Sequence, residues 1–393
     1  MKKNLAVLLT VILLTAALTG CKSSGTANEN PPEETAAVNT ESAETKEDTA
    51  AAEPSEAEVY AKELISRNIT SEDIITEEVI EAVIQELKAA YQFEDIKTIN
   101  SAADSYGYIS QKKGWFDELF GDAGIKVVNV EGSLGNEAQL MERGELHFAY
   151  RMLYPYLLYR SEGADLTAVQ ISEHPDPKIA SVIVRADSGI ENFDDLKGKK
   201  IGSWRAGCPY MVLFEKTESL NWKEGTDWEY VNIPSSEMKT ALLAGEIDAI
   251  SQHPLSSISP ILLDGTAKEI SYAVDDGIYV NGGGSTVVFS PSEFAKENPN
   301  IVKAWTKFRD IVNAYIVQNQ DAAAAIVESV NREPAENTKF WWERSKETLY
   351  RSNYSVEQIK KETKTFQDWL VEHGDISKEK AVDVNELFSE NLL

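Results

Sequence analysis

One pattern of residues occurs twice in this sequence, and it limits the possible folds more than any other feature. The first copy covers residues 136–151 and the second covers residues 237–252. Each copy follows a short apolar segment and a turn-forming segment of a few residues, at 132–135 and 234–236. The copy itself has the pattern of a helix that ends at Gly-Glu and continues into a second apolar segment. Gly144 and Gly245 suit a helix end in the left-handed conformation, because glycine has no Cβ that would clash there. The sequence therefore predicts the same β-α-β unit, with short buried parallel strands, in two similar α/β lobes.

The second strand of each copy runs into a polar loop that contains a proline, at residues 150–155 and 251–254. Parallel α/β sheets bind ligands beyond the carboxyl ends of their strands, so we expect these loops to face each other across a cleft between the lobes. The alternative is that both loops are ordinary connections, but they carry hydrogen-bonding side chains at matching positions. The candidate ligand-binding residues here are Arg151, Met152, Tyr154, Gln252 and His253.

Two further segments lead from an expected strand into a helix, where free N–H groups can hold an anion. The first is a turn-rich loop at residues 101–107, and its polar side chains could instead cap the helix. In the second, at residues 204–208, Arg205 could contact a sulfonate or carboxylate with two hydrogen bonds, or it could be a surface arginine beside a core tryptophan. The candidate residues are Ser101, Asp104, Ser105, Tyr106, Trp204, Arg205, Gly207 and Cys208.

A run of three glycines at residues 282–284 precedes an apolar strand at residues 286–290. Glycines permit unusual backbone angles, which fits either a hinge or a wall that a ligand approaches closely. A phosphate-binding loop is not indicated, because no Lys-Ser/Thr pair follows. Gly283 and Gly284 therefore join the candidate ligand-binding residues.

The start of the chain has the features of an exported protein. Lys2 and Lys3 precede an apolar stretch, at residues 5–18, that fits a signal-peptide core, and Leu-Thr-Gly-Cys at residues 18–21 resembles a bacterial lipobox. The lipobox implies lipidation of Cys21; the alternative is a plain secretory signal with a chance cysteine. Residues 22–58 hold almost no large apolar side chain, so we expect a disordered acidic tether that begins at Cys21. We expect two helices in residues 56–92. As a domain, the N-terminal helical segment is assigned to residues 59–92, after the tether.

Length and charge narrow the function further. A chain of 393 residues can form about two globular units. Its net charge of −27 argues against a nucleic-acid partner, which would require a basic surface. The four histidines and two cysteines show no zinc spacing or disulfide pattern, and no nucleophile elbow or dinucleotide motif is present. We therefore expect no metal, no cofactor and no enzymatic activity.

The remaining elements are predicted from periodicity. Strands are expected at residues 96–100, 166–171 and 179–184, and a helix after residue 204 should continue to residue 220. An apolar stripe at residues 301–315 predicts a buried helix capped by Asn298. Ser355 and Gln358 form a possible capping box for a helix near the end of the chain.

Three ordered segments carry a resemblance to a known family: residues 193–201, 241–249 and 291–302. With the lipobox, they resemble the solute-binding proteins of ABC importers for nitrate, taurine and aliphatic sulfonates, a group that includes proteins binding thiamine pyrimidine precursors. The resemblance covers about residues 96–373. It implies an α/β fold of the periplasmic-binding-protein type II, with two lobes joined by two crossover strands. Lobe 1 would comprise residues 93–187 and 286–393, lobe 2 residues 188–285, and residues 1–20 would be the signal peptide.

The resemblance also implies a function. The chain would be a monomeric, lipid-anchored protein outside the cell membrane that captures a small organic anion between the lobes and delivers it to a permease with its ATPase. Relatives often have an acidic residue where this chain has Gln252-His253-Pro254, so an amino-sulfonate such as taurine is disfavoured. An aromatic ligand of the pyrimidine-precursor kind, stacked between Trp204 and a tyrosine, is the alternative. An enzyme on the same scaffold and a surface receptor are further alternatives.

Overall fold

The computed structural model describes residues 54–173, 180–205, 207–255, 257–272, 285–345 and 356–389. The chain divides into two units, Met1–Ala52 and Glu53–Leu393, and every described residue belongs to the second. The expected signal peptide, Cys21 and most of the tether lie outside the described residues, as do Gly283, Gly284 and Ser355. Among the helices of the described ranges, none combines the length and the apolar character that crossing a membrane requires.

Five strands form the sheet of the first lobe: β1 (Thr98–Ala102), β2 (Lys126–Val130), β3 (Ala149–Met152), β4 (Leu166–Glu173) and β10 (Thr286–Pro291). Strands β1 and β2 are parallel, whereas β10 runs antiparallel between β3 and β4. The two groups meet where Ser101 forms a parallel bridge with Phe148, beside a hydrogen bond of 2.8 Å from the Ala102 N–H to the Phe148 carbonyl. The order across the first lobe is therefore β2-β1-β3-β10-β4.

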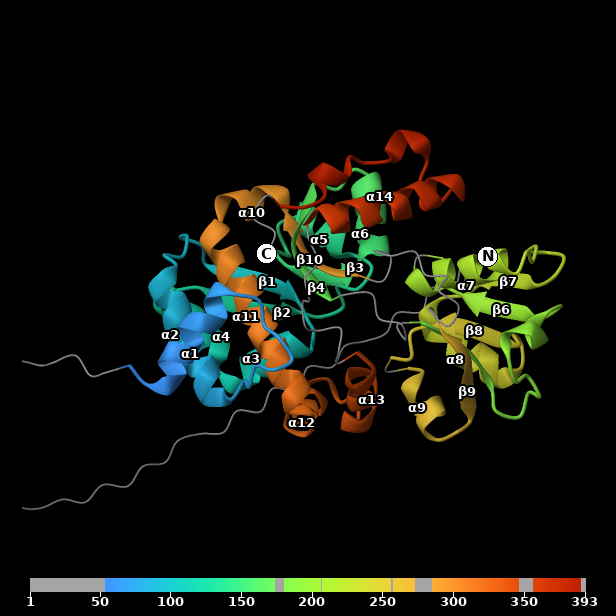
Figure 1. The fold of residues 1–393 in the computed structure, drawn as a ribbon, viewed down its shortest axis with the longest axis horizontal. Coiled ribbons are helices and arrows are strands. Elements are labelled where there is room, and N and C mark those ends of the chain that lie inside the picture. The colour runs from blue at the N-terminus through green and yellow to red at the C-terminus, as the bar shows by residue number, and fades with distance from the viewer. Residues whose placement is uncertain are drawn as a thin grey trace, which may run out of the picture. The chain divides into compact units, whose positions relative to one another are not determined.

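The second lobe repeats this arrangement with β5 (Ser181–Arg185), β6 (Lys200–Ser203), β7 (Glu229–Asn232), β8 (Ala249–Gln252) and β9 (Ala267–Tyr272). Their order is β7-β6-β8-β5-β9; β6 is parallel to β7 and β8, and β5 is antiparallel to β8 and β9. Strands β5 and β10 thus hold corresponding places in the two sheets. The chain passes from the first sheet to the second between β4 and β5, and returns between β9 and β10. The predicted fold of two α/β lobes with two crossovers is confirmed (Figure 1).

The repeated pattern forms the predicted unit in both lobes. Its helices are α5 (Glu137–Glu142) and α8 (Ser235–Ala244), and they lead into β3 and β8. Gly144 and Gly245 have φ angles of +69° and +75°, so each helix ends through a left-handed glycine as expected.

The other helices cover the sheets and fill the space beside them: α1 (Glu56–Ser66), α2 (Glu77–Ala90), α3 (Ser105–Lys113), α4 (Trp115–Phe120), α6 (Leu153–Ser161), α7 (Cys208–Ser219), α9 (Ser259–Leu263), α10 (Ser292–Glu297), α11 (Pro299–Gln318), α12 (Gln320–Asn331), α13 (Ala335–Ser345) and α14 (Val356–Glu372). Four short 3₁₀ helices are η1 (Gly121–Ala123), η2 (Phe193–Leu196), η3 (Lys378–Lys380) and η4 (Val384–Glu386). The predicted apolar stripe lies on α11, which packs against α2 and α3, and its side chains are buried (Figure 1).

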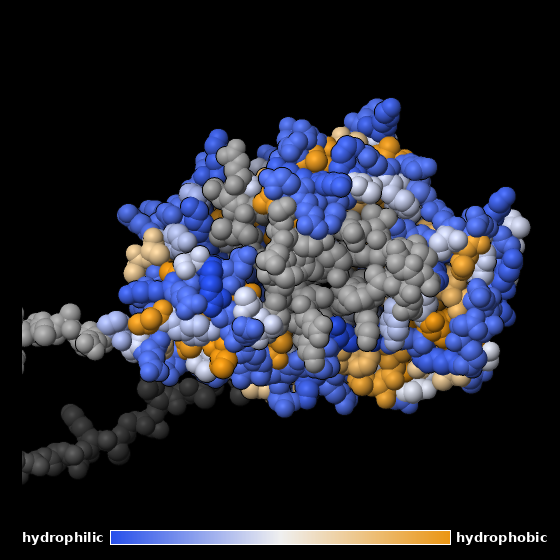
Figure 2. Space-filling model, in the orientation of Figure 1, coloured by the Kyte–Doolittle hydropathy of each residue, from blue (hydrophilic) through white to orange (hydrophobic). Residues whose placement is uncertain are grey.

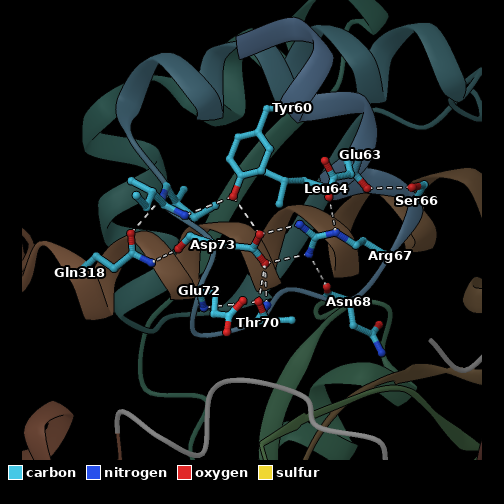
Figure 3. Close-up of polar contacts among 12 residues, drawn as sticks. Tyr60, Glu63, Leu64, Ser66, Arg67, Asn68, Thr70, Glu72, Asp73 and Gln318 are labelled. Carbon is cyan, nitrogen blue, oxygen red and sulfur yellow. Dashed lines mark hydrogen bonds and ion pairs between the residues drawn. The ribbon is translucent and has the colours of Figure 1, made fainter. Parts of the chain in front are cut away.

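A network of polar contacts attaches the α1–α2 hairpin to α11 (Figure 3). The Asp73 carboxylate accepts hydrogen bonds from Tyr60, Arg67 and Thr70. The side-chain amide of Gln318, on α11, donates to the Asp73 carbonyl at 2.7 Å and accepts from the Ile75 N–H at 2.9 Å. Arg67 holds the pKa of Asp73 well below its usual range, so the carboxylate is ionised. The hairpin loop is therefore fixed to the last turn of α11.

Five local features differ from the prediction. The two helices expected in residues 56–92 are present, but α1 begins at Glu56, three residues before the assigned start of the helical segment, because Ser55 and Glu58 form a capping box. Helix α3 begins at Ser105, inside the expected loop, because Asp104 accepts a hydrogen bond from the Gly107 N–H. The helix expected after this loop is divided into α3 and α4 at Gly114, whose φ angle is +78°.

The expected loop at residues 150–155 is the fourth difference, since α6 begins at Leu153 with Pro155 in its first turn. The start of α11 also differs in detail: Asn298 lies at the expected cap position, but its side chain donates to the Phe294 carbonyl. The Glu94 carboxylate accepts from the N–H groups of Asn300 and Ile301 instead.

The described part of the face seen in Figure 2 is mainly hydrophilic. Figure 2 shows charged and polar residues over most of this face, with hydrophobic residues in separate groups. The most exposed large apolar side chains are Leu134, at 73% exposed, and Ile74, at 70%, and they belong to different loops. Isolated apolar residues of this kind are ordinary on a protein surface.

Candidate functional site

A cavity of about 390 Å³ opens at the carboxyl end of β1, where the sheet of the first lobe meets α3. Its walls come from the start of α3, from β3, from the consecutive helices α11, α12 and α13, and from Leu255 of the second lobe. The lining residues are Ala103, Asp104, Ser105, Tyr106, Tyr108, Tyr150, Leu255, Arg309, Asn313, Ile316, Val327, Asn331, Glu333, Asn337, Thr338, Trp341 and Trp342. A volume of this size accepts a small organic molecule.

Arg309 supplies the positive charge in the cavity wall. Its guanidinium pairs with the Asp104 carboxylate at 2.7 Å, and its side chain is only 6% exposed. The same guanidinium faces the rings of Tyr106 and Tyr150, at 4.9 and 4.7 Å from their centroids. Burial by itself would lower the pKa of Arg309, but Asp104 and the two tyrosines outweigh burial and raise the pKa. The arginine is therefore charged and held in place on three sides.

Three buried polar atoms in this wall have no hydrogen-bond partner among the described residues: the Tyr106 hydroxyl, Nε of Arg309 and Oγ1 of Thr338. Leaving such an atom unpaired costs about 1–3 kcal/mol, and native proteins usually avoid that cost. Burial raises the pKa of Tyr106 well above its usual value, so its hydroxyl keeps its proton and can donate. These groups belong to side chains that line the cavity, and a ligand with hydrogen-bond acceptors could pair with them once the side chains turn towards it.

The lining is rich in aromatic side chains and nearly neutral. Five aromatic rings, those of Tyr106, Tyr108, Tyr150, Trp341 and Trp342, belong to it. The charged members are Asp104, Glu333 and Arg309, so the lining carries a formal charge of −1. Flat aromatic walls with a few placed polar groups suit an organic ligand with a ring or an alkyl chain.

The cavity takes in only part of the predicted site. Asp104, Ser105 and Tyr106 line it, whereas Ser101 is buried in β1 beside it, with its hydroxyl directed to the Ala102 carbonyl. Asp104 caps α3, which is the structural alternative considered for this loop, and it contributes to the cavity wall as well.

A second group of predicted residues gathers where the start of α7 meets β3 and α6. The Tyr154 hydroxyl donates to the Arg205 carbonyl at 2.9 Å, and the sulfur atoms of Cys208 and Met152 lie 2.7 Å apart. Burial raises the pKa of the Cys208 thiol to about 12, so this cysteine stays protonated at the helix N-terminus. Gly207 is the N-cap residue of α7 and has an extended conformation. These residues join elements of the two lobes.

Each predicted arginine in this second group is paired with a carboxylate of the protein. Arg151 contacts Glu137 at 2.9 Å, with side-chain exposures of 12% and 2%. Arg205 contacts Asp375 at 2.8 Å, and the Asp375 side chain is 2% exposed. An anionic ligand would have to compete with Glu137 or Asp375 for these cations.

The remaining predicted residues lie in or beside the second lobe. Trp204 packs against its core, and Gln252 contacts the Met238 sulfur at 3.3 Å while its oxygen accepts from the His253 N–H. The His253 ring lies 6.4 Å from that of Trp341, so it approaches the cavity wall from the second lobe. No group of three or more histidine, cysteine or acidic side chains in the described part of the chain could hold a metal ion.

The sequence interpretation missed the contribution of α11 and α13. Arg309, Asn313, Asn337, Thr338 and Trp342 line the cavity, but α11 was predicted only as core and α13 carried no site prediction. One signal was available: Arg309 lies four residues after Trp305, within the apolar stripe of α11. A charged side chain on a buried helix face requires a partner, and this one faces the cavity.

Comparisons with known proteins agree with this architecture. The aliphatic sulfonate-binding protein SsuA of Escherichia coli superposes with a TM-score of 0.65 at 16% identity, over 76% of this chain and 99% of that one. SsuA of Xanthomonas axonopodis pv. citri, solved with MOPS bound, gives 0.63 at 16% identity, over 75% of this chain and 98% of that one. These likenesses confirm the type II fold of periplasmic binding proteins.

A putative aliphatic sulfonates-binding protein of Bacillus subtilis (strain 168) is 25% identical over 229 residues. The match includes 56% of this chain and spans 65% of the length of that relative. The family model described as NMT1/THI5 like matches residues 105–323, from the first residue of α3 into α12. This segment includes both copies of the repeated pattern and more than half of the chain, and the chain therefore belongs to the NMT1/THI5-like family.

Proposed function

We propose that this chain is the solute-binding component of an ABC importer, which captures a small organic solute and delivers it to a membrane permease and its ATPase. The observation that carries the proposal is the cavity beside β1, with aromatic walls and three buried polar atoms that a ligand would satisfy. Family membership and the two repeated lobes support it, since a cavity bordered by both lobes can close on a ligand.

The first candidate ligand is a small organic anion of the sulfonate kind. The names of the relatives support this class, and Arg309 supplies the cation that an anion would contact. Asp104 weakens the attraction, because its carboxylate pairs with Arg309 at 2.7 Å. An anion in the cavity would therefore approach Arg309 from the side of Nε, which has no partner among the described residues.

A neutral aromatic solute is the second candidate, and a specific observation favours it. The charged residues of the lining sum to −1, and five aromatic rings belong to the wall. A ring with acceptor nitrogens could stack on these aromatic side chains and accept from the Tyr106 hydroxyl without competing with Asp104. This candidate places the ligand beside Trp341 and Trp342 rather than beside Trp204.

A thermal-shift panel on the full chain tests both candidates. The probes are 1-hexanesulfonate, taurine, nitrate and 4-amino-2-methylpyrimidine. A probe at one hundred times its dissociation constant stabilises the protein by about 2.7 kcal/mol, which should raise Tm by about 5–10 °C. If none of these probes raises Tm, the proposed ligand classes are refuted.

The variant Asp104→Asn separates the two candidates. Asparagine can still cap α3, because it is as good an N-cap residue as aspartate, but it removes the negative charge beside Arg309. Binding of hexanesulfonate should become about tenfold tighter in this variant, whereas binding of the pyrimidine should change by less than twofold. Weaker hexanesulfonate binding would contradict the placement of an anion at Arg309.

We also propose that the protein is anchored outside the cell membrane through a lipid on Cys21, as the lipobox at residues 18–21 suggests. The variant Cys21→Ser should then appear in the soluble extracytoplasmic fraction, while the unmodified chain stays with the membrane and incorporates labelled palmitate. Equal membrane association of both forms would refute the anchor.

A further inference from the structure

Helix α13 takes part in two different contacts. Asn337, Thr338, Trp341 and Trp342, four of its side chains, line the cavity. The last turn carries Arg344, which reaches β9, the edge strand of the second sheet. A single short helix therefore connects the cavity wall to the second lobe, and the segment matched by the family model ends before this helix begins.

The contact with β9 is a two-point ion pair. The two terminal nitrogens of Arg344 donate to the two carboxylate oxygens of Glu269 at 2.8 and 2.6 Å. The side chains are 11% and 12% exposed, so water screens the pair weakly. The guanidinium also faces the rings of Tyr272, on β9, and Phe340, on α13, at 5.7 and 5.3 Å. Two parallel hydrogen bonds between planar groups fix orientation as well as distance.

The second lobe borders the same cavity elsewhere. Leu255 follows β8 and belongs to the lining, and α9, which comes next in the chain, packs against α13. A displacement of the second lobe away from α13 would therefore move Leu255 and open that side of the cavity. The Arg344–Glu269 pair is a strong polar contact that opposes such a displacement.

We propose that Arg344 and Glu269 form a positioning pair, which holds the α13 wall of the cavity against the second lobe. The pair touches no ligand; it acts through Trp341 and its neighbours on α13. Its consequence for ligand binding rests on the proposed function: when the pair is lost, a smaller fraction of molecules has the complete cavity, and apparent affinity falls in proportion.

Hydrogen exchange in the full, ligand-free chain tests the coupling directly. In Glu269→Gln, the amides of α13 and of α9 should exchange about tenfold faster, since a charge-assisted contact that opposes their separation is lost. The charge-reversed double variant, Arg344→Glu with Glu269→Arg, should bring exchange back towards the unmodified rate.

The matched control is Glu145→Gln, which removes the exposed pair between Glu145 and Arg143 inside the first lobe. This variant should leave exchange in α13 and α9 unchanged. If Glu269→Gln accelerates exchange only within β9, or if the reversed pair behaves like the single variant, the positioning role is overturned.

Titration with 1-hexanesulfonate and 4-amino-2-methylpyrimidine gives the second readout. Whichever probe binds the unmodified chain should bind Glu269→Gln measurably more weakly, by the factor by which the fraction of molecules with the complete cavity falls. Equal affinity in both proteins would overturn the inference. If neither probe binds the unmodified chain, the ligand proposal fails, while the exchange experiment still decides whether the pair couples α13 to the second lobe.

Discussion

Replacing Arg151 by methionine removes a cation from a carboxylate that lies almost wholly inside the protein. Glu137 is 2% exposed and accepts hydrogen bonds from Arg151 at 2.9 Å, from the Tyr159 hydroxyl at 2.6 Å and from the Gly135 N–H at 2.9 Å. Removing one partner of a buried ion pair costs about 3–5 kcal/mol. Two of the three donors stay in place, so we expect a loss near the lower limit, about 3 kcal/mol.

The second copy of the repeated pattern has two uncharged side chains at the positions equivalent to this ion pair, and they can be transferred to the first copy. An offset of 101 residues relates the two copies, so that Met238 and Gln252 correspond to Glu137 and Arg151. They too are in contact, at 3.3 Å between the amide nitrogen and the sulfur. A double variant, Glu137→Met with Arg151→Gln, should therefore recover much of the stability that Arg151→Met loses, because it leaves no unpaired buried charge.

Urea denaturation followed by far-UV circular dichroism measures these differences. Arg143→Met, in an exposed pair of the same lobe, is the control and should leave the midpoint unchanged. If Arg151→Met keeps full stability but its Tm no longer rises with 1-hexanesulfonate, Arg151 binds the ligand and does not stabilise the fold. That result would refute the reasoning.

Three further predictions concern polar side chains of the first lobe and of the α1–α2 hairpin. Asp73→Asn should lower the free energy of unfolding at neutral pH. Because the folded pKa of Asp73 is depressed, the carboxylate contributes stability above its unfolded pKa of about 3.9, and this stability is lost as the pH falls towards the folded value. The urea midpoints of the two proteins should therefore converge in acid. Tyr106→Phe removes a hydroxyl without a partner among the described residues, so Tm should stay equal or rise while the affinity for the bound probe falls about tenfold. Glu94→Gln weakens the cap of α11 at Asn300 and Ile301, and a loss of about 1 kcal/mol in urea denaturation is expected; an unchanged midpoint would contradict the capping role.

The elements that sequence predicted well depend on local chemistry. Helix α2 is one of the two helices expected in residues 56–92, and it begins where the Thr76 side chain accepts from the Val79 N–H. The two left-handed glycines of the repeated pattern follow in the same way from the absence of a Cβ. The strand order of each lobe required the resemblance to a family, because pairing between distant strands leaves no local signal.

The candidate site was predicted only in part, because its chemistry depends on contacts between distant segments. Asp104 was recognised as a possible cap, but its pairing with Arg309 joins residues 205 positions apart. Arg151 and Gln252 were chosen because they end matching strands. In the structure each contacts the helix of its own copy, and that contact was not visible from spacing.

Helix α11 connects the α1–α2 hairpin to the cavity. One side of the helix carries Arg309 at the cavity, and Lys307, two residues earlier, donates to the Arg67 carbonyl in the hairpin loop at 2.6 Å. Gln318 binds the same loop near the end of the helix. The hairpin thus fixes the outer side of α11 at two points about three turns apart, Lys307 and Gln318, which sets where the inner side holds Arg309. A change in the hairpin should consequently alter ligand affinity through α11, although no hairpin residue lines the cavity.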